Sequence, residues 1–151
     1  MTNRDMPPKI KIIEALSAVA DDRIKNDALL PNEWKCLSSS TPWKIYTIFY
    51  DEKNNAISSN DSWTIIQHYL WYPAIAFLLK IWKIDFDKKI LEILKNIDWS
   101  KLKSQTNKNY EDSFRLILWN LHLSGYDVDF VISQVEYIYN QLLDFQLKKL
   151  N

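Results

Sequence analysis

The sequence predicts an α+β fold that is mostly helical: an N-terminal helix and a small antiparallel sheet of two or three strands, packed on a bundle of four or five helices. Apolar residues recur at helical spacing near the N-terminus, and a β-branched and aromatic run fills 45–50. From Ser62 onward the pattern is helical. Because 151 residues suit one domain, we expect a single domain over 1–151, with a helix and β-hairpin part at 8–60 and a helical part at 62–150.

The helix and the strands are expected in the first part of the chain. An apolar stripe at steps of three and four predicts the first helix, which the polar run to Asp27 ends; its members are Ile10, Ile13, Leu16, Ala20 and Ile24. A weak alternation at 34–38 and the run at 45–50 predict two strands. Asparagine tolerates the left-handed backbone of a hairpin, so 51–55 is a predicted turn and 56–58 a short return strand.

Helices are predicted for the remainder. A long one begins at Ser62 and runs to about Trp82, and Pro73 should kink it or split it near Trp71. Asp87 and Asp127 are expected to cap two further helices, and another begins at 109–112. Gly125 follows that helix, where a residue with positive φ is favoured. The polar stretch 100–109 is the predicted loop.

Composition excludes several classes of protein. One glycine cannot build a phosphate-binding loop or a dinucleotide fingerprint, which need several. One cysteine forms no internal disulfide, and with two histidines it cannot complete the usual zinc site, so we expect no metal and no cofactor. The apolar segment 69–79 would rise only about 16 Å as a helix. With no apolar leader at the N-terminus, we expect a cytoplasmic protein with no membrane contact.

The polar link between the hairpin and the long helix is the best candidate for a binding site. Its helix-capping side chains and backbone N–H groups can hold an anion. The neighbouring helix adds an imidazole, which ordinarily titrates near neutrality, and a cluster of aromatic rings. The candidates are Ser58, Asn60, Asp61, Trp63, His68 and Trp71. Helix capping and core packing explain the same residues without any ligand.

The last predicted helix carries apolar residues on two sides, so it needs two surfaces to pack against. The candidate interface residues are Val135, Ile138, Leu142, Leu143, Phe145 and Leu147. With 14% aromatic residues in the chain, the leading hypothesis is a non-enzymatic interaction module. It would self-associate as a homodimer through aromatic and apolar helix faces, or bind an unidentified protein partner. The alternative explanation is that all of these apolar residues pack within the chain's own helical bundle.

Several short segments resemble a group of small, uncharacterised archaeal proteins: 38–40, 46–48, 58–61 and 72–78. The first helix is similar to that group too, and the resemblance implies no activity. Residues 33–83 also weakly resemble a SWIM-type zinc module, which is a hairpin followed by a helix. The zinc ligands of such a module would fall near Ser58, Asn60, Trp71 and Pro73, none of which offers a thiolate or an imidazole. This degenerate SWIM-like resemblance implies an interaction or nucleic-acid-related module without the metal.

Two alternative functions remain open. The Lys-rich 80–108 region could serve a zinc-free nucleic-acid-binding module, since residues 61–109 hold eight lysines against five acids. A formal net charge of zero does not favour this. The second alternative is an enzyme of unknown type around His68 and Asp61, with the imidazole as general base.

Overall fold

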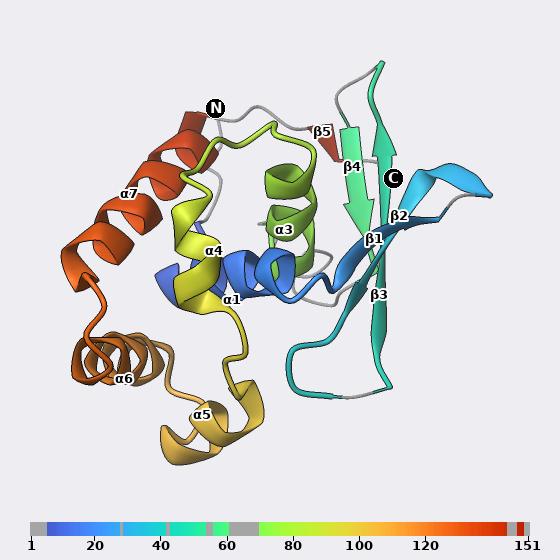
Figure 1. Ribbon diagram of the computed structural model, residues 1–151. Coiled ribbons are helices and arrows are strands. Elements are labelled where there is room, and N and C mark those ends of the chain that lie inside the picture. Colours follow the sequence, from blue (N-terminus) through green and yellow to red (C-terminus); the bar gives the residue numbers. More distant parts are fainter. Residues whose placement is uncertain are drawn as a thin grey trace.

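The computed structural model describes residues 6–27, 29–41, 43–53, 56–60, 70–144 and 148–149. In these residues the sheet forms one layer, α1 and α3 pack beside it, and the other helices lie beyond them (Figure 1). The helices are α1 (Lys9–Ala20), α3 (Tyr72–Lys80), α4 (Lys89–Leu94), α5 (Trp99–Gln105), α6 (Tyr110–Leu123) and α7 (Val128–Asp144). The strands are β1 (Ile24–Asp27), β2 (Leu30–Leu37), β3 (Ile45–Asp51), β4 (Ala56–Ser59) and β5 (Lys148–Lys149).

The sheet is larger than the sequence predicted. Four antiparallel strands lie in the order β1-β2-β3-β4, and β5 adds to β4 in parallel. The expectation of two or three strands was wrong mainly because Ile24 was assigned to the first helix. Asp22 has a φ of 56° and turns the chain out of α1, so Ile24 begins β1 and pairs with Cys36. The prediction of an α+β, mostly helical fold is confirmed.

One prediction about the helical part, the loop at 100–109, was also wrong. Pro73 lies in the first turn of α3, where a missing N–H costs no hydrogen bond. The backbone at Trp71 is extended, so a helix begins at the point where the sequence predicted a kink or a split. The predicted helix positions up to Tyr69 lie outside the described residues. The predicted loop at 100–109 contains α5, which begins after Asp98; the Asp98 side chain accepts a hydrogen bond from the Lys101 N–H.

Helices α6 and α7 begin where the sequence predicted, and α6 also ends as predicted, before Gly125. The Asn109 side chain accepts from the Asp112 N–H at the start of α6, and that of Asp127 accepts from the Phe130 N–H at the start of α7. Gly125, between them, has a φ of +86°. Asp87 likewise accepts from the Lys89 N–H before α4.

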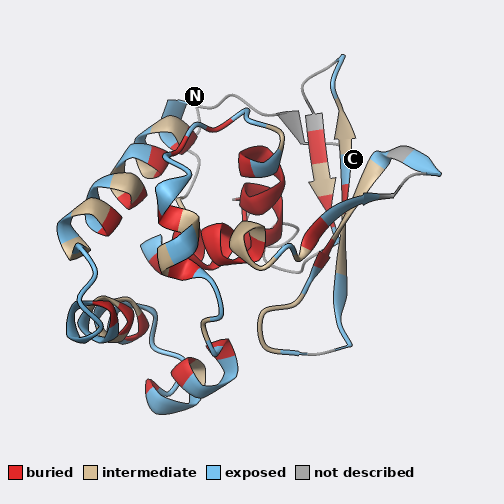
Figure 2. Ribbon diagram, in the orientation of Figure 1, coloured by how far each residue is buried: buried red, intermediate tan, exposed pale blue. Residues whose placement is uncertain are grey.

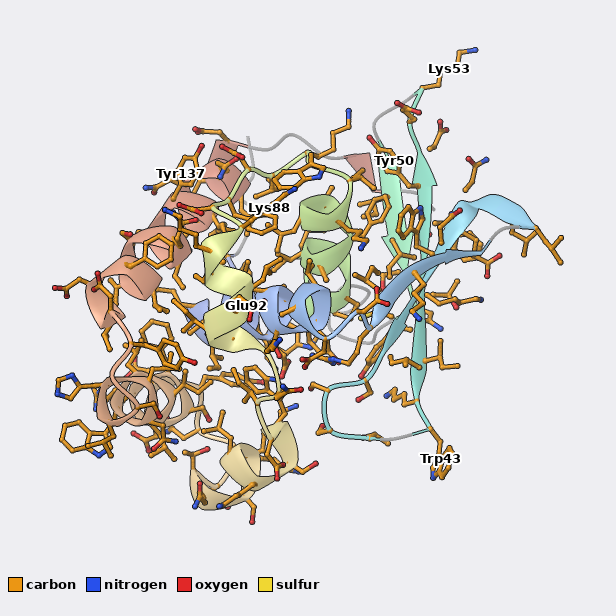
Figure 3. The ribbon with its side chains drawn as sticks, in the orientation of Figure 1. Trp43, Tyr50, Lys53, Lys88, Glu92 and Tyr137 are labelled. Carbon is orange, nitrogen blue, oxygen red and sulfur yellow. The ribbon has the colours of Figure 1, made fainter. Side chains whose placement is uncertain are left out.

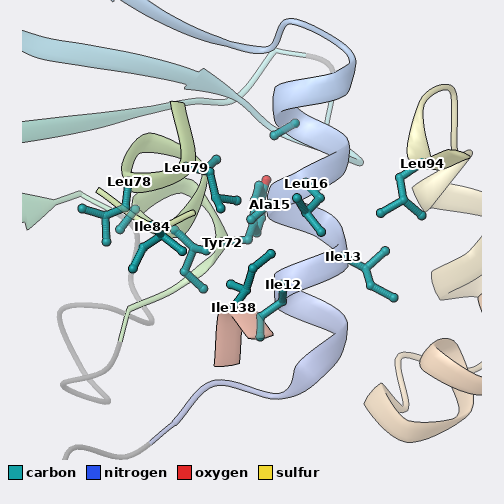
Figure 4. Packing of buried hydrophobic residues seen from close by; sticks show 14 of the residues in the cluster. Ile12, Ile13, Ala15, Leu16, Tyr72, Leu78, Leu79, Ile84, Leu94 and Ile138 are labelled. Carbon is teal, nitrogen blue, oxygen red and sulfur yellow. The ribbon is translucent and has the colours of Figure 1, made fainter. Parts of the chain in front are cut away.

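The core is centred on α1 and α3, which are buried along almost their whole lengths (Figure 2). In the close-up, Ile12 of α1 lies near Ile138 of α7, and Ala15 of α1 lies near Leu79 of α3 (Figure 4). Because α3 contacts β1, β3 and β4 as well as α1, it joins the sheet to the helical part of the core. A helix with no solvent face must match any charge it carries inside the protein, and α1 carries two in its buried stretch.

Candidate functional site

A cavity of about 380 Å³ opens beside the buried side of α1. Its walls come from α1, the chain around β2 and β3, the start of α3, α5 and the start of α6. The described lining residues are Ile10, Lys11, Glu14, Ser38, Ser40, Thr41, Lys44, Tyr46, Trp71, Tyr72, Trp99, Leu102, Lys103, Lys108, Tyr110 and Ser113. The volume lies in the range of pockets that hold small organic ligands.

Glu14 is the electrostatic centre of this wall. Its side chain is 0% exposed, and both carboxylate oxygens have partners. Oε1 accepts from Lys11 Nζ at 2.9 Å, while Oε2 accepts from Ser39 Oγ at 3.1 Å and lies 3.3 Å from Lys103 Nζ. These partners come from α1, the β2–β3 connection and α5. The buried carboxylate therefore ties three parts of the chain together around the cavity.

The Lys11 ammonium lies against three aromatic rings. Its Nζ is 4.4 Å from the Trp71 ring centroid, 5.3 Å from that of Tyr110 and 5.6 Å from that of Tyr72. Contacts of this kind contribute roughly 2 kcal/mol when the cation is desolvated. Burial lowers the pKa of Lys11; the Glu14 carboxylate opposes that shift, and the Lys103 charge adds to it. Loss of hydration outweighs ion pairing, so Lys11 holds its proton less firmly than an exposed lysine.

Hydrogen bonds fix the loop between β2 and β3 against the same wall. The Ser39 N–H donates to the Tyr72 hydroxyl at 3.0 Å, and Lys103 Nζ donates to Ser40 Oγ at 3.2 Å. Burial, followed by the Glu14 charge, raises the pKa of Tyr72, so this phenol stays neutral across the physiological range. Ser100 Oγ donates to the Ser40 carbonyl, which joins the start of α5 to the loop. The serines are therefore held in place before any ligand arrives.

The charges along the cavity favour an anion. Among the described lining residues, four lysines face one carboxylate, and that carboxylate already has two lysine partners. Lys44 lies 5.1 Å from the Tyr46 ring centroid at the same opening. The rings of Trp71, Tyr72 and Tyr110 supply apolar surface beside the lysines. This arrangement suits an organic anion with a flat apolar part.

The structure brings one of the predicted binding residues to this cavity. Trp71 is buried and lines it. Asn60 closes the end of β4 instead: its side-chain oxygen accepts from the Thr47 N–H at 2.7 Å, and its own N–H donates to the Thr47 carbonyl. Ser58 pairs with Phe49 within the sheet. Asp61, Trp63 and His68 lie outside the described residues, and so does the enzyme hypothesis built on His68 and Asp61.

The predicted interface residues divide by burial. Val135, Ile138 and Leu142 belong to the chain's own core, so they leave nothing for a second copy to contact. Leu143 is 52% exposed on the other side of α7. Phe145 and Leu147 lie outside the described residues. Exposed aromatic rings are present elsewhere, and Trp43 projects from the β2–β3 connection away from the body of the molecule (Figure 3).

Sequence reasoning missed Lys11 and Glu14, and it included Lys103 only as one member of the Lys-rich 80–108 region. A usable signal was present in the first helix, where Ile12, Ile13, Ala15 and Leu16 surround Glu14 on nearly every side. A helix that is apolar all round is buried, and any charge within it needs a partner at i+3 or i+4 or from another element. The Lys11–Glu14 pair meets that requirement at i+3. Nothing in the local sequence around Lys103 indicated that it would reach the same carboxylate.

Within the described residues, no group of three or more His, Cys, Asp or Glu side chains is arranged to hold a metal ion. None of the helices in that same part of the chain has the length and apolar character needed to span a bilayer.

Fold and cavity together define a class, a small α+β protein with a lysine-lined aromatic pocket beside a buried ion pair. The family is shown by a match that covers residues 4–148, to the family described as uncharacterised conserved protein UCP014422. The chain belongs to that family. No curated protein matches the chain. Nor does any solved structure.

Proposed function

We propose that the protein binds a small organic anion, with the anionic group on the cavity lysines and a flat apolar part against the rings of Trp71 and Tyr110. The observation that carries the proposal is the charge of the wall, where four lysines face one carboxylate that is already paired. A ligand carboxylate or phosphate would add the missing negative charge in a partly desolvated place, where ionic hydrogen bonds are strongest.

Lys103 is the cavity lysine that lies at the opening with its ammonium already fixed in position. Its side chain is 29% exposed, so it faces the opening while it is anchored by Glu14 and by the hydroxyls of Ser39 and Ser40. An anchored ammonium loses little side-chain entropy when an anion arrives. Lys101 of the same helix is exposed and does not line the cavity, which makes it a matched control.

Calorimetric titration with 3-phenylpropionate and with 3-phenylpropylamine tests this proposal. The two probes share an apolar body and differ in the sign of their charge. We expect the anion to bind and the amine not to bind. Lys103→Met should weaken anion binding roughly ten- to hundredfold, because it removes one positive charge from a partly desolvated wall. Lys101→Met should leave it unchanged. Equal binding of both probes, or equal losses in both variants, would contradict the proposal.

The functions expected from the sequence are supported less strongly. Self-association has lost the buried members of its predicted interface and stays a prediction that depends on Leu143 and on residues outside the described part. Nucleic-acid binding through the Lys-rich 80–108 region, the archaeal origin and the SWIM-like resemblance also stay predictions.

A further inference from the structure

Lys11 places a primary amine in the wall of the cavity, although its side chain is only 6% exposed. It sits in the middle of α1, a rigid and buried helix, so its position does not depend on a loop. Glu14 lies one turn further along and holds the amine at 2.9 Å, and the Trp71 ring covers it at 4.4 Å. Burial, together with the neighbouring Lys103 cation, favours the uncharged and nucleophilic form of this amine, and the Glu14 carboxylate opposes them.

The Glu14 carboxylate stays balanced when Lys11 is neutral. Its Oε2 keeps the Lys103 ammonium at 3.3 Å and the Ser39 hydroxyl at 3.1 Å. A neutral Lys11 still has N–H groups with which to donate to Oε1. Removing the Lys11 proton therefore leaves one cation on one carboxylate, which is the arrangement that a buried site tolerates best. Lys103 makes the uncharged form of Lys11 compatible with the fold.

Resting on the proposed anion binding, we propose that Lys11 forms a reversible imine with the carbonyl carbon of a 2-oxo acid whose carboxylate is held by the other cavity lysines. The substrate class follows from three groups that lie together in the cavity wall. The Lys11 amine can attack a carbonyl carbon, the other lysines can pair with the substrate carboxylate next to that carbon, and the aromatic rings can contact an apolar tail. The cavity volume of about 380 Å³ accommodates an acid with one aromatic ring.

The step is balanced without any oxidant or reductant. The lone pair of the neutral Lys11 amine forms a bond to the carbonyl carbon, and the carbonyl π electrons move to the oxygen, which takes up a proton. The nitrogen gives up its hydrogens as the hydroxyl leaves as water, and a carbon–nitrogen double bond forms. Glu14, 2.9 Å from the nitrogen, is in position to accept and return the proton in these transfers.

Trapping with sodium cyanoborohydride tests the inference, with phenylpyruvate as the probe. We expect the intact protein to gain the mass of one reduced adduct and peptide mapping to place that adduct on Lys11. Lys11→Arg keeps a cation but cannot form the imine, so its adduct should be lost. Lys9→Arg is the matched control because Lys9 is exposed on the same helix and pairs with Glu136. In this variant the adduct on Lys11 should still form.

Binding of 3-phenylpropionate separates this inference from the function on which it rests. That probe has the shape of phenylpyruvate without its ketone. If it binds but phenylpyruvate gives no adduct on Lys11 of the unmodified protein, the imine is wrong and anion binding stands. If neither compound binds, both fail. Labelling spread over exposed lysines, or an adduct that persists in Lys11→Arg, also overturns the imine. Mapping on the unmodified chain decides the question even if that variant folds poorly.

Discussion

Helices α1 and α7 both pack on the core, but polar residues are buried in α1 and at least partly exposed to solvent in α7. Helix α1 is buried at every position from Ile10 to Ala18, including Lys11 and Glu14. Helix α7 buries one stripe, Val131, Val135, Ile138 and Leu142, and turns its other side to solvent (Figure 2). In α7 the helical period places one apolar stripe in the core, while the solvent side carries the polar residues together with exposed Ile132 and Leu143. In α1 no side faces water, so charges are matched by partners that the fold brings to them.

This difference gives the two helices different roles. A charge on α7 can be hydrated, and its loss should change little. A charge on α1 is held at a defined place by desolvation and by several partners, which is the condition for a binding or reacting group. The site lies against the more completely buried of the two helices, where electrostatic interactions are stronger than at the surface.

The largest expected effect is the loss of the carboxylate in α1. Glu14→Gln leaves the buried Lys11 without a counter-ion and removes one partner of Lys103. We expect the free energy of unfolding to fall by about 3 to 5 kcal/mol in urea titrations at neutral pH. The deficit should shrink at alkaline pH. In this variant the folded pKa of Lys11 lies even further below its unfolded value, so stability rises as pH passes through the interval between them.

The matched control is the ion pair that joins the two helices. Lys9 of α1 pairs with Glu136 of α7 where both side chains are exposed. Glu136→Gln should cost less than about 1 kcal/mol. Similar losses in the two variants would remove the contrast between the helices.

The fold could be predicted from the sequence where one local interaction decided the outcome. Asn109, Asp127 and Gly125 act within one turn of their own helix, and each works as predicted. Ile24 was misassigned because it fits the stripe of α1, and Asp22, which breaks the helix, carries no strong stop signal. The loop prediction at 100–109 failed because the short helix α5 buries only two side chains, those of Trp99 and Leu102. Two apolar positions are too few to show a helical repeat in the sequence.

The candidate site was largely invisible to such reasoning. Trp71 was named for its aromatic ring, which is a property of the residue itself. Lys103 and Ser39 are 64 positions apart and meet only when α5 folds against the β2–β3 connection. No spacing in the sequence encodes that contact. What the sequence did contain was the charged pair in α1, which its apolar surroundings marked as buried.

A smaller effect is expected from the hydroxyl that supports the charged side of α1. Tyr72→Phe removes the acceptor of the Ser39 N–H and should cost about 1 kcal/mol at neutral pH. The pKa of Tyr72 is raised in the folded state. Its contribution is therefore fully present below about pH 10 and is lost as pH rises through the folded value. In alkaline urea titrations the stabilities of the native chain and Tyr72→Phe should converge. A constant difference would show that the phenol is not held neutral.

The smallest expected effect concerns the solvent side of α7. Leu143 is the described member of the predicted interface that remains exposed, so Leu143→Lys should change the free energy of unfolding by less than about 0.5 kcal/mol. Because the buried stripe of α7 is already used within the chain, the predicted self-association depends on the solvent side of α7 and on residues outside the described part. Sedimentation velocity at micromolar concentration tests it, and a native chain that is a monomer, like Leu143→Lys, would contradict it. If the native chain is a dimer that Leu143→Lys dissociates, α7 has a second working surface. The solvent side of α7 would then hold defined partners, as the buried positions of α1 do.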